Sequence, residues 1–251
     1  MSVFRRFYYW LPRLIRNILG PILTSIPFTF RCQQKRWIKD KYARFGLDQK
    51  RHIFMSIARF CNINRPMTGY YFEFGCHSAG TMRMAFDHSR YLFDWDYVAF
   101  DSFEGLPEIP DIDKQEIWVK GKLKTTEEEF WGIVVGHGMP PGKLKTVKGF
   151  YDKTLTKELK ASLLPKKAVV VYIDCDLYSS TVPILPFIKD FLQVGTIIVF
   201  DDWYSFYGGP NRGERRAFRE FREKNPELMF EEFVHTNEQG SFIFLGKKEA
   251  P

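Results

Sequence analysis

Four aspartates near the middle of the sequence could do chemistry together. They stand in two close pairs, Asp174 with Asp176 and Asp201 with Asp202. Carboxylates that share one site repel one another, and burying them is costly unless something compensates the charge. The two pairs therefore predict either a cation site or a proton relay, provided that the fold brings them together.

The elements beside these pairs would position them. Each pair directly follows a largely apolar run, residues 169–173 in one case and 196–200 in the other. Such runs are typical of parallel strands that are covered on both faces. Residues 180–192 are long enough to form the crossover helix between two such strands. Ligands bind outside the carboxyl ends of parallel strands, so both pairs should face the same site.

A second candidate site begins at Glu73, near the end of the expected strand 70–74. The loop Gly75-Cys-His-Ser-Ala-Gly80 follows it, and a helical run starts at Thr81. A strand, a glycine loop and a helix in this order can bind a charged small ligand at the helix N-terminus. The spacing E-x-G-x-x-x-x-G is not that of a dinucleotide site, and a plain turn is the simpler interpretation of a lone glycine loop. Glu73 favours a zwitterionic ligand, because a carboxylate holds an ammonium group and repels a pyrophosphate.

Asp101 follows the next expected strand, residues 97–100. A carboxylate in this position accepts two hydrogen bonds from a vicinal diol, as in the ribose sites of related folds. Alone, Asp101 could be a helix cap or a turn residue. Together with Glu73 and Gly75 it predicts a site for a nucleoside.

A long polar segment, residues 107–142, comes after Asp101 and predicts a lid over the substrate, since long insertions at this edge are usually functional. Its aromatic residues are either acceptor contacts or the core of the lid itself: Trp118, Phe130 and Trp131. His137 could reach the site, although a solvated loop histidine is the simpler interpretation.

The element order predicts an α/β fold, with a doubly wound and mostly parallel seven-stranded sheet and an N-terminal helical arm. A turn-rich patch at residues 62–69 divides the chain into a basic arm, 1–65, and a main domain, 66–251. The last of the closing strands is expected to be antiparallel. The seven expected strands are residues 70–74, 97–100, 144–147, 169–173, 196–200, 229–234 and 241–245.

Composition sets the general class of the protein. With 251 residues, 45% of them apolar and 17% aromatic, the chain can build a full core. Its four cysteines form no CxxC pair, which indicates free thiols in a reducing compartment and argues against a zinc site. We therefore expect a cytoplasmic protein.

The charge is concentrated at one end. Residues 1–60 contain 13 lysines and arginines against two acids, although the whole chain has a net charge of only +7. This basic, aromatic segment predicts peripheral membrane contact through residues 1–36 at the inner face of the membrane, or else an arm that packs on the body or in a homo-oligomer. Its apolar run, 17–30, is too short to span a bilayer. Nucleic-acid binding is not expected, because no known motif accompanies the charge.

Five motifs in order carry a family resemblance. They resemble the successive motifs of the macrocin and mycinamicin sugar O-methyltransferases, a group that includes the aminocoumarin deoxysugar enzymes, and the resemblance covers roughly residues 68–246. It implies a Rossmann-like class I fold and methyl transfer from S-adenosylmethionine to a hydroxyl group of a sugar or glycosylated acceptor. The motifs are Tyr71-Phe-Glu-Phe-Gly75, Asp101-Ser-Phe-Glu-Gly-Leu-Pro107, Gly149-Phe-Tyr-Asp-Lys-Thr-Leu155, Ile173-Asp-Cys-Asp-Leu-Tyr-Ser-Ser-Thr181 and Phe200-Asp-Asp-Trp203.

The resemblance also implies roles for the acids. Asp174, Asp201 and Asp202 would hold Mg²⁺ or another divalent cation, and oxygen-only ligands suit that ion. Asp174 would in addition accept the proton of the acceptor hydroxyl. Asp176 could cap the following helix, orient a neighbouring side chain or reach the ion; we expect it to support the ligands without touching the ion.

The cofactor residues that the resemblance implies follow the chain. Glu73 and Gly75 would contact the methionine end of S-adenosylmethionine, and Ser78 and Gly80 would contact the cofactor from the loop and the helix start. Asp101 would bind the ribose diol, and Ser102 would lie beside the adenine. Tyr151 and Asp152 would flank the adenine.

Two other classes of function compete with this interpretation. An NAD-linked oxidoreductase would use a similar sheet, but G-x-G-x-x-G is absent and the acid pairs would have no role. A catalytically inactive, membrane-associated nucleoside-binding protein would have no need to keep Asp174, Asp201 and Asp202. The methyltransferase interpretation accounts for both the glycine loop and the acids.

Overall fold

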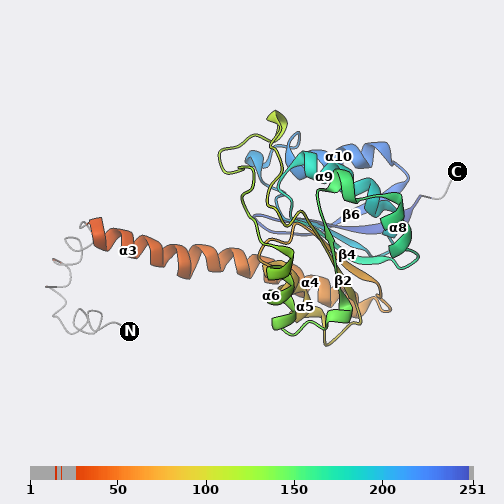
Figure 1. The fold of residues 1–251 in the computed structure, drawn as a ribbon, viewed down its shortest axis with the longest axis horizontal. Helices are drawn as coiled ribbons and strands as arrows, with labels where there is room; N and C mark the ends of the chain where they lie inside the picture. Colours follow the sequence, from red (N-terminus) through yellow and green to blue (C-terminus); the bar gives the residue numbers. More distant parts are fainter. Residues whose placement is uncertain (1–14, 16–17, 19–26, 249–251) are drawn as a thin grey trace. The chain divides into compact units, whose positions relative to one another are not determined.

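The computed structural model describes residues 15, 18 and 27–248 of the chain (Figure 1). The chain divides after Asp48 into two compact units. In the first unit, α3 (Pro27–Trp37) and the π-helical segment η1 (Ile38–Tyr42) lead into α4 (Ala43–Ile63). The N-terminal region is therefore helical from residue 27, as expected. Most of the segment expected to touch a membrane lies outside the described residues. Among the helices that the structure describes, none is long and apolar enough to cross a bilayer.

Helix α4 explains why the second unit begins earlier than the boundary expected at residue 65. The unit starts at Gln49, so it includes the second half of this helix. Ile53, Phe54 and Ile57 are buried there, and their spacing of three to four residues places them on one face of the helix. That face is part of the core of the main domain.

The second unit is built on one seven-stranded sheet with the strand order β3-β2-β1-β4-β5-β7-β6. The first five strands are mutually parallel, and β7 is antiparallel to both β5 and β6. The doubly wound, mostly parallel sheet is thus confirmed. The strands are β1 (Tyr70–Phe74), β2 (Asp96–Asp101), β3 (Leu144–Lys148), β4 (Ala168–Ile173), β5 (Ile197–Phe200), β6 (Leu228–His235) and β7 (Gly240–Lys247).

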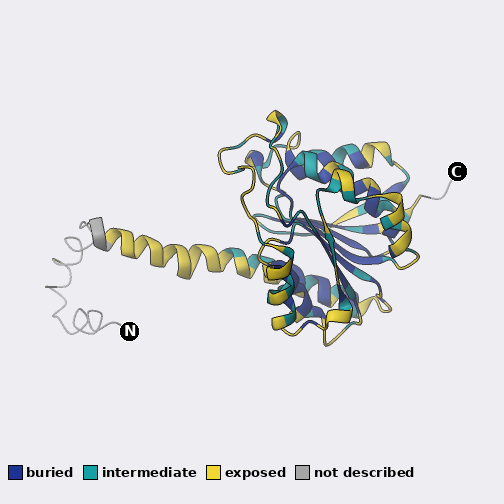
Figure 2. Cartoon of the chain, in the orientation of Figure 1, coloured by how far each residue is buried: buried dark blue, intermediate teal, exposed yellow. Residues whose placement is uncertain are grey.

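Helices cover both faces of the sheet, as Figure 1 shows. One face packs against α4, α5 (Gly80–Ser89) and α6 (Glu127–Gly136), and the other against α8 (Lys157–Leu163), α9 (Tyr178–Ile188) and α10 (Gly213–Lys224). Every residue of β4 and β5 is buried (Figure 2), which is why these strands lack polar alternation. The remaining short elements are α7 (Tyr151–Thr154), η2 (Asp111–Asp113), η3 (Pro141–Lys143), η4 (Lys189–Phe191) and η5 (Phe206–Gly208).

The segment expected to form the lid is only partly irregular. Its second half contains α6, which opens with a capping box in which Thr126 and Glu129 satisfy each other's backbone N–H groups. Phe130 is fully buried in the core cluster, and Trp131 packs against that cluster while donating a hydrogen bond to Thr146. Phe130 and Trp131 therefore belong to the packed face of the main domain, which favours the second of the two expected alternatives, a structural role, over contact with the acceptor.

Candidate active site

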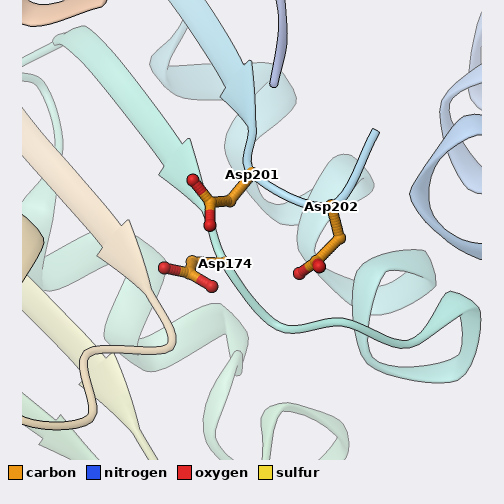
Figure 3. A group of neighbouring side chains, drawn as sticks. All are labelled: Asp174, Asp201 and Asp202. Carbon is orange, nitrogen blue, oxygen red and sulfur yellow. The ribbon is translucent and has the colours of Figure 1, made fainter. Parts of the chain in front are cut away.

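The acid pairs meet at the carboxyl ends of β4 and β5. These strands are neighbours in the sheet, so Asp174 after β4 lies beside Asp201 and Asp202 after β5 (Figure 3). One carboxylate oxygen from each of the three lies within 4.8 Å of the others. Oxygen atoms at this spacing can coordinate a divalent cation such as Mg²⁺.

The electrostatics of the cluster also favour a cation. Burial, followed by the charge of Asp201, raises the pKa of Asp174 to about 8. Burial and the neighbouring acids raise the pKa of Asp202 well above its usual range. The Oδ2 atom of Asp202 is buried and finds no hydrogen-bond partner among the residues that the structure describes. An unsatisfied carboxylate oxygen in such surroundings fits a metal ligand.

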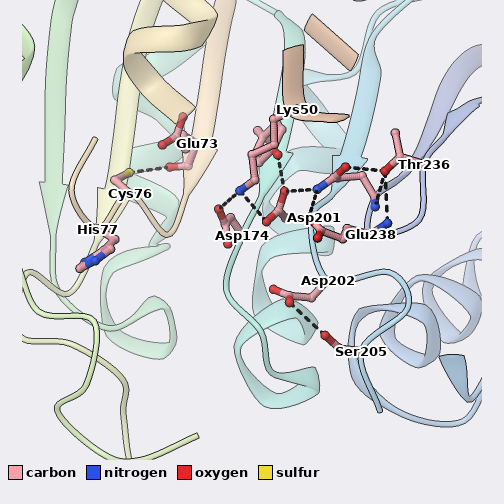
Figure 4. Close-up of polar contacts among 12 residues, drawn as sticks. Lys50, Glu73, Cys76, His77, Asp174, Asp201, Asp202, Ser205, Thr236 and Glu238 are labelled. Atoms are coloured by element: carbon pink, nitrogen blue, oxygen red, sulfur yellow. Dashed lines mark hydrogen bonds and ion pairs between the residues drawn. The ribbon is translucent and has the colours of Figure 1, made fainter. Parts of the chain in front are cut away.

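A lysine from α4 provides a positive charge within the cluster (Figure 4). The Nζ atom of Lys50 lies 2.7 Å from Oδ2 of Asp201 and 3.5 Å from Oδ2 of Asp174. These two contacts raise the pKa of Lys50 although burial opposes the charge. The ammonium group therefore stays protonated between the two carboxylates.

Two further groups orient Asp201. Its Oδ1 atom accepts a hydrogen bond from the hydroxyl of Tyr172 and another, at 3.1 Å, from Nε2 of Gln239. Tyr172 and Gln239 are both fully buried. Two buried side chains thus bind Oδ1 of Asp201, and only Oδ2 contacts the ammonium group of Lys50.

Asp202 is fixed by the segment that follows β5. Its Oδ1 atom accepts a hydrogen bond from Oγ of Ser205 at 3.0 Å, and its backbone N–H donates to Oε2 of Glu214 at 3.0 Å. Glu214 is fully buried in the first turn of α10, and its other carboxylate oxygen has no partner among the described residues. The start of α10 therefore positions the backbone of the acid pair.

Asp176 lies against Asp202. It is buried with a left-handed φ of 63°, and its pKa is raised to about 7 by burial and by Asp174, while a hydrogen bond with Asp202 opposes the rise. It does not cap α9, because the N–H groups of Tyr178 and Ser179 donate to Asp113 at 2.8 and 3.0 Å. The position of Asp176 is compatible with the supporting role expected of it, which stays a prediction.

Glu73 forms the buried end of the expected cofactor site. The residue is fully buried, and its Oε2 atom accepts a hydrogen bond from the hydroxyl of Tyr71 at 2.6 Å. Within the described part of the chain, Oε1 has no partner. Burial raises its pKa well above the usual range. A cationic group of a ligand, such as an ammonium group, would provide the missing hydrogen-bond donor to this carboxylate.

The glycine loop joins the cofactor side to the acid cluster. Gly75 has a φ of +86°, and a Cβ atom there would lie 1.8 Å from the carbonyl oxygen of Asp174. Helix α5 begins at Gly80 without a side-chain cap, and the space beside Gly80 is open. Ser78 is exposed next to it. The backbone N–H groups of the first turn of α5, which a helix leaves unbonded, are therefore the donors available to a ligand here.

Asp101 closes this loop onto the end of β2. Its Oδ2 atom accepts hydrogen bonds from the backbone N–H groups of Cys76 and His77 at 2.7 and 3.2 Å, and Oδ1 accepts from that of Phe103 at 2.7 Å. A carboxylate has about four acceptor positions, so one is left for a ligand hydroxyl. Its expected contact with ribose stays a prediction.

The remaining expected cofactor residues lie around the same strand ends. The Ser102 hydroxyl donates to the carbonyl of Gly105 at 2.8 Å. The Tyr151 hydroxyl donates to the carbonyl of Phe100 at 3.2 Å, and Asp152 is exposed. Tyr151 is therefore anchored to the end of β2, whereas Asp152 is open to solvent.

Comparisons with known proteins agree with this geometry. The macrocin-O-methyltransferase (TylF) family model matches residues 62–235, which is more than half of the chain. The chain belongs to the macrocin O-methyltransferase family. It is an S-adenosylmethionine-dependent O-methyltransferase, and neither an NAD-linked oxidoreductase nor an inactive nucleoside-binding protein is favoured.

Solved structures of other methyltransferases share its fold. The O-methyltransferase NovP superposes with a TM-score of 0.63 at 18% identity, covering 78% of this chain and 79% of NovP. The calicheamicin methyltransferase CalS11 gives a TM-score of 0.62 at 19% identity and covers 90% of each chain. A second structure of CalS11, a TDP-rhamnose 3'-O-methyltransferase, gives 0.56. No curated protein matches this methyltransferase in sequence.

His137 of the methyltransferase is exposed, as in the simpler interpretation, and Trp118 is half-buried within the insertion. His137 contacts Asp87 of α5, with Nε2 2.9 Å from Oδ2, and is not part of the acid cluster. The indole N–H of Trp118 is buried, and no group in the described part of the chain accepts a hydrogen bond from it. His77 of the glycine loop instead meets the insertion, because its Nδ1 donates to the carbonyl of Leu123 at 3.0 Å.

Several residues of the methyltransferase that shape the site were missed in the sequence. One pattern in the sequence could have predicted that Lys50 points towards the main domain. It precedes Ile53 and Ile57 by three and seven positions, and so it shares the buried face of α4. No signal pointed to Asp113, because a helix cap contributed from 65 residues upstream has no local pattern. Tyr172, Gln239 and Glu214 likewise acquire their roles only through contacts between distant segments.

Proposed function

We propose that this methyltransferase transfers the methyl group of S-adenosylmethionine to a hydroxyl group of a sugar or glycosylated acceptor, in a reaction that needs a divalent cation. The observation that carries the proposal is the triad Asp174, Asp201 and Asp202, placed beside the glycine loop at the carboxyl edge of the sheet. The sugar class rests on the family and on CalS11, which acts on TDP-rhamnose. Asp174, Asp201 and Asp202 would hold the ion.

The chain's own residues have distinct tasks in this proposal. An ion held there would act as a Lewis acid and would lower the pKa of the acceptor hydroxyl group. Asp174 accepts the hydroxyl proton, since its backbone is tied to the donor loop at Gly75 and its carboxylate faces Asp201. The acceptor oxygen then bonds to the methyl carbon as the carbon–sulfur bond breaks, which leaves a neutral thioether. Glu73 binds the ammonium group of the donor.

A methyl-transfer assay with several acceptors tests the proposal. The full-length protein is incubated with S-adenosylmethionine and a panel of nucleotide sugars and glycosides, and methylated products are detected by mass spectrometry. We expect a methylated sugar in the presence of Mg²⁺, none in EDTA, and recovery when Mg²⁺ is added back. Transfer that survives EDTA would contradict the metal requirement, and transfer only to non-sugar acceptors would contradict the acceptor class.

We also propose that the helical arm contacts an anionic membrane surface at the cytoplasmic face. The arm has exposed apolar side chains, with Trp37 58% and Phe45 52% exposed, and Trp37 stacks on Tyr42. Basic residues lie among them: Arg31, Lys35, Arg36, Lys39, Lys41 and Arg44. Aromatic and cationic groups together suit an anionic lipid interface. A second copy of the arm would carry the same charge, which disfavours self-association through it.

Vesicle flotation tests this contact. We expect the protein to float with vesicles that contain phosphatidylglycerol and not with pure phosphatidylcholine, and Trp37→Ser together with Phe45→Ser to weaken flotation. Sedimentation without vesicles is the control for a homo-oligomer. No flotation, combined with a dimer that the two substitutions dissociate, would identify a second copy as the partner instead.

A further inference from the structure

Lys50 occupies a specific place in the acid cluster. It lies on α4, in the same compact unit as the acids, and its side chain is 22% exposed. The ammonium group bridges Oδ2 of Asp201 and Oδ2 of Asp174. A cation thus already lies between two of the three carboxylates that could coordinate a divalent ion.

The hydrogen bonds of Asp201 restrict how an ion could join Lys50. The Oδ1 atom of Asp201 already accepts two hydrogen bonds, from Tyr172 and Gln239. A carboxylate oxygen has two lone pairs, so Oδ1 is saturated within the protein. Only Oδ2 is available to an ion, and Lys50 holds that oxygen at 2.7 Å.

Charge makes sharing of this oxygen unfavourable. An ammonium group and a divalent ion on the same carboxylate oxygen would lie within a few ångströms of each other in a partly buried site, where like charges repel strongly. The lysine side chain has a flexible four-carbon stem, so the ammonium group can leave the oxygen without movement of the helix.

We propose that Lys50 is the internal cation of the acid cluster, and that a divalent metal ion binds by displacing its ammonium group from Asp201 and Asp174. The inference rests on the metal site of the proposed function. Lys50 is then a positioning residue: it keeps the carboxylates together before the ion arrives, and it lowers the affinity for the ion.

Metal binding to a lysine variant tests the proposal directly. Lys50→Met keeps the length of the side chain and removes its charge, and Lys41→Met in the exposed arm is the matched control. We expect Mn²⁺, followed by electron paramagnetic resonance, to bind K50M at least about tenfold more tightly than wild type, with K41M unchanged. In EDTA the thermal unfolding midpoint of K50M should fall, and Mn²⁺ should restore it. Equal or weaker Mn²⁺ binding by K50M overturns the inference.

Chemical labelling of the wild-type protein gives a second test that does not depend on a variant folding. Lysine acetylation is read by peptide mass spectrometry with EDTA or with Mn²⁺. We expect Mn²⁺ to raise the labelling of Lys50 several-fold and to leave Lys41 unchanged. Labelling of Lys50 that ignores Mn²⁺, while Mn²⁺ does bind, overturns the displacement and leaves the metal site intact. Failure of Mn²⁺ to bind either wild type or K50M overturns both proposals.

Discussion

The carbonyl oxygen of Asp174 occupies the space that a side chain on Gly75 would need. A Cβ atom at Gly75 would lie 1.8 Å from that oxygen, and the backbone N–H of Asp174 donates to the carbonyl of Phe74 at 2.8 Å. Because β1 and β4 are adjacent, the loop that follows β1 and the first acid after β4 are in direct backbone contact. The spacing between the donor loop and the acid cluster is therefore set by the sheet and not by mobile side chains.

Replacing Gly75 should disturb both sites at once. Gly75→Ala places a Cβ in a backbone clash and in a left-handed conformation, so we expect the free energy of unfolding to fall by about 2–4 kcal/mol. Urea denaturation measures the change. Gly80→Ala is the matched control, since nothing lies within 4 Å of its added Cβ. Equal stability of the two variants would contradict the close approach of the strand ends.

The aspartates should differ in their effect on metal binding. Asp174→Asn removes a charged ligand, whereas Asp176→Asn changes a group that reaches the cluster through Asp202. We expect D176N to weaken Mn²⁺ binding by about 10–100-fold and D174N to weaken it further. Titration calorimetry provides the comparison, with the exposed Asp111→Asn as control. The reverse order of effects would make Asp176 the ligand.

Glu73 should determine the affinity for the methyl donor. Its Oε1 atom is buried and meets no partner in residues 27–248, so a ligand ammonium group would gain a charge-assisted hydrogen bond there. We expect Glu73→Gln to weaken S-adenosylhomocysteine binding by about tenfold or more, which corresponds to about 1.4 kcal/mol. Calorimetry with the exposed Glu128→Gln as control measures this. Unchanged affinity would assign Glu73 a purely structural role.

Asp113 should hold the insertion onto α9. It is fully buried and caps the helix through Tyr178 and Ser179, so Asp113→Ala leaves two backbone N–H groups unsatisfied. We expect a loss of about 2–3 kcal/mol in unfolding free energy and faster proteolysis within residues 107–126. Asp111→Ala, two positions away on a fully solvated side chain, should do neither. If both variants are cleaved alike, the cap is not what orders the insertion.

Asp96, at the amino end of β2, should make the stability of the protein depend on pH. Burial favours a higher pKa, but hydrogen bonds from Lys166 and Lys143 outweigh it and lower the pKa below 3.8. A depressed carboxylate pKa stabilises the folded state fully above the unfolded value of about 3.8, and this contribution is lost as the pH falls through the folded value.

The corresponding variant checks the sign of this effect. Asp96→Asn should cost about 0.5–1 kcal/mol at pH 7, and the difference from wild type should shrink as the pH falls below 3.8. Urea unfolding at pH 7 and pH 3 measures both values. Asp94→Asn is the control, because Asp94 is 87% exposed although it also contacts Lys143. A difference that grows towards low pH would contradict the assignment.

Much of the fold could be predicted because its signals are local. The runs ending at Phe74, Ile173 and Phe200 show continuous burial, and the acids or glycines that follow them mark the strand ends. The prediction that parallel strands bring Asp174 and Asp201 to one edge needed only the rule for parallel sheets. The burial of Phe130 and Trp131 was harder to predict, because the helix that carries them lies within a polar segment of the kind that usually forms a surface lid.

The sequence alone determined where the core strands lie along the chain, the acid pairs and the family, since each depends on short-range periodicity or on residues a few positions apart. The tertiary structure decided which groups act on those acids. Lys50 lies more than a hundred residues before the carboxylates it bridges, and Asp113 caps a helix that begins 65 residues later in the chain. Contacts of this kind depend on how helices pack against the sheet, and that packing places a cation beside the acid cluster.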